Sequence, residues 1–283
     1  MIDVSVIIVS WNTRELLGRC LKSLFEQTHG VSFEVFVVEN ASSDDSAEMV
    51  RSEFTQVNLI ANDANLGFAR ANNQAIAEAK GECVLLLNPD TELIDDGISN
   101  LVAVARKHPE AGIVGGKILN PDRSIQASVR RFPTLCSQVL ITLKFHHAFP
   151  DIPCLRRYFA NDVNPESEQS ADQVMGAFFL ISRQALNIVG TLDERFFIWF
   201  EEVDYCKRVV NAGLKVLYTP VAQVVHHGGE SFAQVFALKK QKMFNASLAK
   251  YMRKHFGRRA WLAIQILRPV SLLLAWFSGF VHG

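Results

Sequence analysis

The sequence predicts an α/β fold built around a mostly parallel β-sheet. Short β-branched apolar runs alternate with segments of helical periodicity through the N-terminal third. Polar clusters follow the ends of these runs, as they do at the ligand-binding edge of open parallel sheets. The 283 residues, 49% of them hydrophobic, are enough for one large domain, or for one domain plus an appendage.

The N-terminal part alternates strand and helix with a regular rhythm. Continuous apolar runs of Val, Ile and Leu are typical of strands that are buried on both faces. Apolar residues spaced three and four apart indicate helices between them. Strands are predicted at residues 4–9, 33–38, 57–61 and 83–87, and helices at 13–25, from about 46, and at 67–80.

The second half is less regular. Its predicted helices end at Gly190 and Gly213, since glycine commonly follows the last helical residue. Residues 130–172 have no clean period and should form loops and short helices. Helices are predicted at 94–108, 183–189 and 201–212, strands at 111–119, 174–182, 214–218 and 222–226, and a long basic helix at 231–255.

Four polar clusters follow a strand or open a helix, so all four should lie at one edge of the sheet. Any one alone is more often a turn or a helix cap, but four in succession favour a ligand site. Together they could hold a base, a ribose, a diphosphate and a metal. The clusters are Ser10-Trp11-Asn12, Glu39-Asn40-Ala41-Ser42, Asn65–Arg70 and Asn88-Pro89-Asp90.

Two acidic clusters end apolar runs. Asp90 follows the strand at 83–87, and one carboxylate there, with donor phosphates, suits Mg²⁺ or Mn²⁺. Glu201, Glu202 and Asp204 follow an aromatic segment that could exclude water and raise a carboxyl pKa. A carboxylate facing an acceptor hydroxyl could then act as a general base. The alternative is acidic charge at a helix N-terminus, with Asp204 pairing with Arg208.

These clusters, taken in order, resemble glycosyltransferase family 2 in its rhamnosyltransferase-like branch. The resemblance covers about residues 3–256 and includes Leu192–Asp204 and the closing motif His226–Ser231. It implies a nucleotide-diphospho-sugar transferase fold of the GT-A type. It also implies inverting transfer of a sugar from a nucleotide diphosphate to a hydroxyl.

The resemblance implies roles residue by residue. Asp90 matches the metal-binding aspartate, with His226 or His227 near the diphosphate. Glu202 matches the base, with Glu201 as the second choice, and both Glu39 and Glu202 stand where the family usually has aspartate. The donor-binding set is Ser10, Asn12, Glu39, Asn40, Asn65, Gly67, Arg70 and Asn88. Neighbours in a strand point to opposite faces, so at most one histidine should face the cleft.

The C-terminal tail is basic and apolar. After Glu230 there is no acidic residue, while nine Lys and Arg remain. This favours an interfacial anchor on an anionic membrane, since the apolar run at 269–281 is shorter than a spanning helix needs. The alternatives are a helix that closes the core and a homodimer interface, and the aromatic end argues against nucleic acid.

The five cysteines form no CxxC pair, so we expect reduced thiols. The first residues lack the pattern of a signal peptide. We therefore expect a cytoplasmic protein at the inner face of the membrane. The predicted catalytic domain is 1–231, with halves at about 1–92 and 93–231, and the tail is 232–283. The leading hypothesis is a metal-dependent rhamnosyltransferase that builds a cell-surface polysaccharide or a lipid-linked precursor. The alternatives are a sugar nucleotidyltransferase, whose glycine-rich loop is missing after the first strand, and an inactive sugar-nucleotide-binding module.

Overall fold

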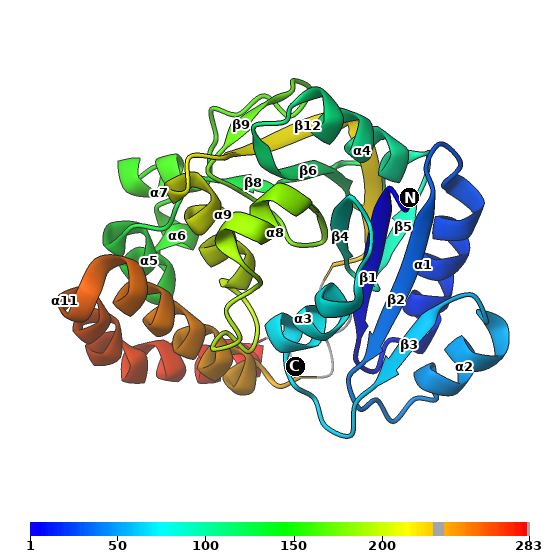
Figure 1. The fold of residues 1–283 in the computed structure, drawn as a ribbon. Helices are drawn as coiled ribbons and strands as arrows, with labels where there is room; N and C mark the ends of the chain where they lie inside the picture. Colours follow the sequence, from blue (N-terminus) through cyan, green and yellow to red (C-terminus); the bar gives the residue numbers. More distant parts are fainter. Residues whose placement is uncertain (229–234, 282–283) are drawn as a thin grey trace.

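A mixed, mostly parallel sheet forms the centre of the molecule (Figure 1). The computed structural model describes residues 1–228 and 235–281, except for the side chains of 278–281. The strand order is β3-β2-β1-β4-β11-β6-β12-β5, with β7 beside β6 and β9 beside β12. The strands are β1 Val4–Ser10, β2 Phe33–Glu39, β3 Asn58–Ala61, β4 Cys83–Leu87, β5 Thr91–Leu93, β6 Ala111–Leu119, β7 Ile125–Gln126, β9 Gln169–Ala171, β11 Phe178–Ser182 and β12 Lys215–His226.

Helices cover both faces of this sheet. The alternation along β1 shows why: Val6 and Ile8 belong to one buried cluster and Ile7 and Val9 to the other. Strands buried on both faces are therefore confirmed. The first cluster packs against α1 Arg14–Gln27, α2 Ser46–Glu53 and α4 Gly97–Lys107, and the second against α3 Phe68–Glu78, α8 Arg183–Val189 and α9 Glu201–Asn211.

Two strand predictions need correction. The run 174–182 is interrupted: β10 Gln173–Val174 pairs with β8 Val129–Arg130 in a separate two-stranded sheet, and β11 begins only at Phe178. The strands predicted at 214–218 and 222–226 form one strand, β12, because a register shift between Thr219 and Gln223 absorbs the irregularity. The short β5 escaped prediction. Because β5 pairs with β12, the two predicted halves share one sheet.

The C-terminal helix extends beyond its predicted end. Helix α11, Ala237–Val281, breaks at Gly257, whose φ of 84° is left-handed. The segments on either side lie next to each other, joined by a buried hydrogen bond of 3.1 Å between Asn245 and Ser271 (Figure 1). By length and composition alone, α11 could cross a membrane, contrary to the prediction from the run at 269–281. The predicted start at 231 lies outside the described residues.

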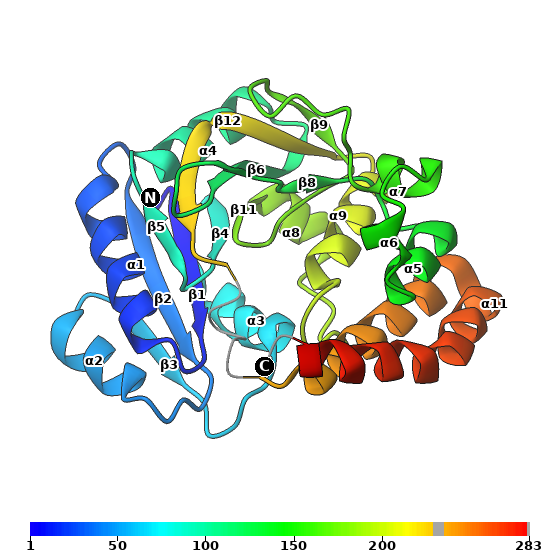
Figure 2. The same cartoon turned by 180° about the vertical axis from the view of Figure 1, so that it is seen from behind.

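Three short helices fill the predicted irregular region; α5 packs on α11, and α6 and α7 pack on α5 (Figure 2). They are α5 Leu135–Thr142, α6 Phe145–Ala148 and α7 Pro153–Tyr158. A disulfide joins Cys136 of α5 to Cys154 of α7, so the prediction of five reduced thiols is wrong. The error arose because sequence spacing does not reveal which short helices pack together. The other three cysteines are free and buried.

Candidate functional site

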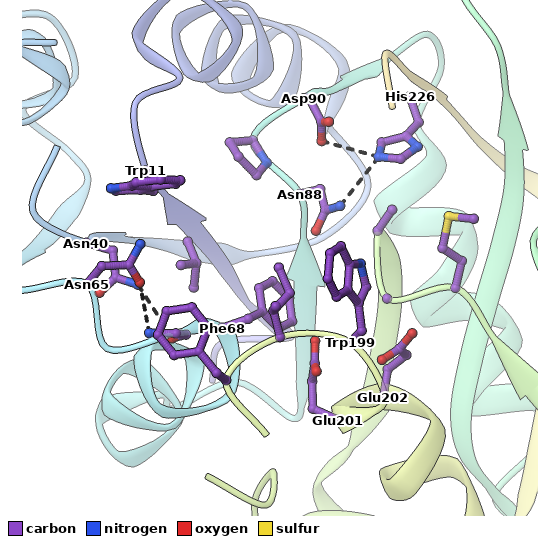
Figure 3. Close-up of a pocket in the computed structure, with 18 residues that line it drawn as sticks. Trp11, Asn40, Asn65, Phe68, Asn88, Asp90, Trp199, Glu201, Glu202 and His226 are labelled. Atoms are coloured by element: carbon purple, nitrogen blue, oxygen red, sulfur yellow. Dashed lines mark hydrogen bonds and ion pairs between the residues drawn. The ribbon is translucent and has the colours of Figure 1, made fainter. Parts of the chain in front are cut away.

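A hollow of about 380 Å³ lies beyond the carboxyl ends of β1, β2 and β4 (Figure 3). We call it the first hollow. The strand ends bring polar groups to one side of it, and the segment before α9 closes the other. Its lining includes Trp11, Asn40, Asn65, Gly67, Phe68, Asn88, Asp90, Met175, Trp199, Glu201, Glu202 and His226.

Asn40 organises one end of the first hollow. Its backbone N–H donates to the Ser10 carbonyl at 2.9 Å, which continues the β1–β2 pairing by one residue. Its side chain donates to Asn65 Oδ1 at 3.1 Å and accepts from the Leu66 N–H at 3.0 Å. Because Asn65 in turn accepts from the Gly67 N–H, two amides fix the loop that opens α3.

Gly67 allows two loops to touch. Its φ of 83° is a region that side chains rarely adopt, and an added Cβ would lie 2.5 Å from the Phe197 carbonyl oxygen. That same oxygen accepts a hydrogen bond of 2.7 Å from the Phe68 N–H. The first turn of α3 is thereby attached to the segment that carries the acidic cluster.

Asp90, His226 and Asn88 meet at the opposite end of the first hollow (Figure 3). Asp90 is 4% exposed, and its Oδ1 lies 3.3 Å from His226 Nε2. The same histidine nitrogen lies 3.4 Å from Asn88 Nδ2, while Nδ1 is held at 2.7 Å by Gln126 Oε1. The buried Asp90 Oδ1 has no hydrogen-bond partner among the described residues.

This arrangement passes a simple test for a divalent cation. Asp90 Oδ1, which has no hydrogen-bond partner among the described residues, and His226 Nε2 together offer two ligand atoms. A hard cation commonly completes its coordination shell with phosphate oxygens. In the described part of the chain, no group of three His, Cys, Asp or Glu side chains could hold a metal by itself. The residues therefore fit a cation that a bound diphosphate helps to hold.

Glu201 and Glu202 lie across the first hollow from Asp90 and His226 (Figure 3). The Oε2 atom of each is buried without a hydrogen-bond partner among the described residues. Burial raises the pKa of Glu201 well above its ordinary value, and the charge of Glu202 raises it further. Burial also raises the pKa of Glu202, against backbone hydrogen bonds that lower it. A raised pKa makes a carboxylate a better proton acceptor near neutral pH.

The residues just before α9 are backbone-strained. Trp199 and Phe200 both have left-handed φ values, 61° and 69°. Such conformations cost about 1–3 kcal/mol each in non-glycine residues and cluster at functional sites. Phe200 packs into the cluster formed with α11, and Trp199 lines the first hollow. Trp199 also packs against that cluster, so the strained turn places both aromatic rings beside α11.

Asp204 does not reach the first hollow. Its carboxylate is fully buried and paired with Arg208, Lys254 and His255 at 2.7–2.9 Å. The pairing with Arg208, which the sequence offered as an alternative, is thus confirmed. Asp204 fastens α9 to α11, and its position does not support a role in catalysis.

Several predicted donor-binding residues line the edge rather than the hollow. Ser10 bonds to Thr13, and Glu39 accepts from the Ser42 N–H at 2.9 Å, so both brace turns. Asn12 holds the turn after β2 and lies in a neighbouring depression. Arg70 is exposed and lies 4.0 Å from Glu194. Of the eight predicted donor-binding residues, four line the first hollow: Asn40, Asn65, Gly67 and Asn88.

The two neighbouring histidines point to different places, as expected of a strand end. His226 lines the first hollow, whereas the His227 ring bonds to Glu92 at 2.8 Å and faces the neighbouring depression. The structure therefore separates His227 from Asp90's side chain, and only His226 remains in the candidate cation set.

A second hollow of about 220 Å³ lies beside the first and was not predicted. The two share Met175, Trp199 and Glu202 as a common wall. Its remaining lining includes Arg130, Tyr158, Gln173 and Phe244. These residues come from the region without periodicity, from β10 and from α11. The only signal in the sequence was the cationic and aromatic content of that region.

The mixed sheet with a hollow at its carboxyl edge is the architecture of GT-A glycosyltransferases. A mannosyltransferase from Pyrobaculum calidifontis, solved with GDP-Man and Mn²⁺, matches with a TM-score of 0.62 at 17% identity, covering all of this chain and 76% of that one. The 1–349 fragment of S. aureus TarS matches with a TM-score of 0.56 at 16% identity, covering 96% and 80%. The likeness at these identities concerns the fold.

Sequence comparison gives the family. The chain belongs to glycosyl transferase family 2, whose sequence model matches residues 5–187. It is 31% identical over 243 residues to the N-acetylglucosaminyl-diphospho-decaprenol L-rhamnosyltransferase of Mycobacterium tuberculosis, covering 82% of this chain and 78% of the relative. A low-salt glycan biosynthesis hexosyltransferase of Haloferax volcanii is 23% identical, covering 99% and 91%. The predicted family and its rhamnosyltransferase-like branch are confirmed.

Proposed function

We propose that this glycosyltransferase transfers rhamnose, with inversion, from a deoxythymidine-diphospho donor to a hydroxyl of a lipid-linked sugar. One observation carries the proposal: Glu202 lines both hollows, whereas Glu201 lines only the first. A general base that removes a proton from the acceptor hydroxyl must contact the acceptor. The sugar donor must lie on the far side of that hydroxyl, within reach of its oxygen. Its place in both linings supports Glu202 as this base, with the donor in the first hollow and the acceptor in the second.

The reaction balances with Glu202 as base. The acceptor oxygen attacks the anomeric carbon of the sugar from the face opposite the diphosphate, so a new carbon–oxygen bond forms. The bond from that carbon to the diphosphate oxygen breaks, and its electron pair stays on the diphosphate. The hydroxyl proton passes to the Glu202 carboxylate. Burial raises the pKa of both neighbouring carboxyls, and the charge of Glu202 raises that of Glu201 further, so the two titrate as a pair.

Asp90 and His226 would hold a divalent cation together with the donor diphosphate. When bound, such a cation offsets the negative charge that builds on the leaving group. Mn²⁺ accompanies the nucleotide-sugar in the mannosyltransferase of similar fold. Asn88, within 3.4 Å of His226, positions the imidazole at this end of the first hollow.

The choice of donor and acceptor rests on the relative. The mycobacterial protein is named for rhamnose transfer to N-acetylglucosaminyl-diphospho-decaprenol, and its match covers most of both chains. The aromatic wall of Trp199 and the neighbouring phenylalanines supports transfer to a sugar rather than to water, since it covers the hollow that Glu202 faces. We therefore favour a cell-surface polysaccharide precursor as product.

Calorimetry of donor binding tests the proposal. Deoxythymidine-diphospho-rhamnose and uridine-diphospho-glucose are titrated into the full chain, each with and without Mn²⁺. We expect Mn²⁺-dependent preference for the first donor. Preference for the second would replace the sugar and keep the mechanism, while binding of either donor without turnover on any acceptor would favour the inactive module.

A variant isolates the cation site. Asp90→Ala should lose the Mn²⁺-dependent part of donor affinity and keep the rest, since the amides of Asn40 and Asn65 are untouched. Glu92→Ala is the matched control, because its carboxylate pairs with His227 outside the first hollow. Equal donor affinity of Asp90→Ala with and without Mn²⁺, at the wild-type value, would refute the cation role.

We also propose that α11 holds the enzyme at the cytoplasmic membrane surface. Its second segment exposes an apolar stripe at helical spacing: Leu262, Ile266, Val270, Leu273 and Phe277. Exposed arginines, among them Arg258 and Arg259, lie on the same segment. A basic, apolar helix of this kind binds anionic interfaces. The opposite side of the segment packs on the core through Ala260 and Ile264, which supports lying on the membrane rather than crossing it.

A further inference from the structure

Arg130 is a partly buried cation that lacks a counterion. It ends β8 and faces the second hollow. Its guanidinium donates to the Val129 carbonyl at 3.3 Å and lies over the Phe159 ring, 5.3 Å from the centroid. Within the described residues it forms no ion pair, whereas the next residue, Arg131, bonds to Asp162 at 2.9 Å.

Such a guanidinium is energetically unusual. Burial of a charge without a partner is costly, and proteins normally pair it or bring an anion to it. Burial lowers the pKa of Arg130, which reports the same missing compensation. An aromatic ring and one neutral carbonyl satisfy only part of a five-donor group. The remaining donors are free to bind a planar or tetrahedral anion.

The position of Arg130 relative to Glu202 limits what that anion can be. Both side chains line the second hollow, and Glu202 also borders the first. A ligand of the second hollow therefore meets both a carboxylate and a guanidinium. Trp199, Phe200 and Phe244 supply apolar surface in the same hollow, which is suited to the face of a sugar ring.

Two further polar groups border the second hollow. Tyr158 and Gln173 line it, and the Gln173 amide is held in place by a bond of 2.7 Å to the Arg131 carbonyl. Burial raises the pKa of Tyr158, and the charges of Arg130 and Glu202, both near its phenol, lower and raise it respectively. Tyr158 therefore lies close to both Arg130 and Glu202.

We propose that the second hollow is the acceptor site and that Arg130 binds an acceptor phosphate. The acceptor class is a sugar joined through phosphate or diphosphate to a lipid, with the reacting hydroxyl at Glu202 and the phosphate one sugar ring away at Arg130. This inference rests on the proposed function for the direction of transfer. The phosphate recognition itself depends only on Arg130 and the hollow.

The test compares two acceptors that share one sugar. One is N-acetylglucosamine diphosphate carrying a short prenyl chain, and the other is the neutral alkyl glycoside of the same sugar. In the full chain, Arg130→Gln should raise KM for the diphosphate acceptor about ten- to hundredfold, the loss expected for a charged hydrogen bond. The KM for the donor and the rate on the neutral glycoside should stay unchanged.

Arg131→Gln is the matched control, because it removes the neighbouring arginine that already has a carboxylate. Arg130→Lys keeps the charge and should recover part of the affinity, which separates phosphate binding from a loss of folding. An equal effect of Arg130→Gln on both acceptors would overturn the proposal. So would a rise confined to the donor KM, which would assign Arg130 to the donor diphosphate.

Direct binding keeps the two proposals separable. Calorimetric titration of the diphosphate acceptor, without donor, should give an affinity that Arg130→Gln weakens and Arg131→Gln does not. If this holds while no donor supports transfer, the proposed function fails and the phosphate site stands. If wild type and Arg130→Gln bind the diphosphate acceptor equally, the phosphate site is refuted whatever the activity.

Discussion

Replacing Asp204 by asparagine should destabilise the fold rather than remove a reacting group. The carboxylate is fully buried and accepts hydrogen bonds from Arg208 Nε at 2.9 Å and from Lys254 Nζ and His255 Nε2 at 2.8 Å. It is the point at which α9 and α11 are joined. Asparagine keeps the shape but leaves the partner charges inside without their anion.

The magnitude follows from the burial of the partners. Breaking a fully buried ion pair costs roughly 3–5 kcal/mol, because the remaining charge is uncompensated. Lys254 and Arg208 keep 25% and 21% of their side-chain surface exposed. Partial solvation and screening reduce the expected loss to about 2–3 kcal/mol. For a chain of this size, that lowers Tm by roughly 4–10 °C.

The effect should vanish in acid. Burial alone would raise the pKa of Asp204, but hydrogen bonds from His255 and Lys254 and the charge of Arg208 lower it on balance. Because the folded pKa is depressed, this stability is complete above the unfolded value of about 4 and is lost as the pH falls through the folded pKa. Wild type and Asp204→Asn should therefore converge at low pH.

Thermal unfolding followed by circular dichroism, from neutral to acid pH, measures both effects. Glu194→Gln is the control, since its exposed carboxylate lies 4.0 Å from Arg70 and such pairs contribute about 0–1 kcal/mol. Below its Tm, Asp204→Asn should still bind the nucleotide-sugar donor. An unchanged Tm together with complete loss of transfer would refute the structural role and return Asp204 to the catalytic set.

Three further outcomes are expected. Glu202→Gln should keep donor affinity and lose transfer. In the wild type, the initial rate should rise with pH at an apparent pKa above the ordinary glutamate value, because burial raises the pKa of Glu202. A rate profile that titrates near 4 would contradict this. Gly67→Ala should lose about 1–2 kcal/mol of stability through its left-handed φ and should also weaken donor binding, because the clash with Phe197 displaces the loop that opens α3, whereas Gly190→Ala, also left-handed but in open space, should lose stability alone. Ile266→Glu should release the protein from anionic vesicles in a sedimentation assay, and the exposed Val221→Glu on β12 should not; equal release would refute the proposed anchor.

The sheet and its binding edge were predictable because local rules decide them. The run Val4–Val9 is apolar at every position apart from Ser5, so it can only be a strand between two layers of helix. The ends of β1, β2 and β4 then share an edge, which brings Asn40, Asn88 and Asp90 into the lining of one hollow as expected. Here spacing along the chain determines position in space.

Side-chain direction was harder to predict. Asp204 is three residues from Glu201 on the same helix, yet Glu201 lines the first hollow and Asp204 pairs with α11. The sequence contained Arg208, Lys254 and His255 but did not reveal that α11 brings the last two to Asp204. His226 and His227 were separable, because strand geometry alone sends adjacent residues to opposite faces.

The second hollow could not have been predicted from the sequence, because its lining comes from distant parts of the chain. Arg130, Gln173 and Phe244 are far apart in the chain, and each is unremarkable where it stands. What distinguishes Arg130 from Arg131 is the absence of a carboxylate partner within the described residues, which depends on the fold of residues 130–172. A buried cation without its anion is a feature of tertiary structure. If Glu202, which lines the same hollow, is the proposed base, the anion that Arg130 lacks is best supplied by the acceptor that Glu202 would deprotonate.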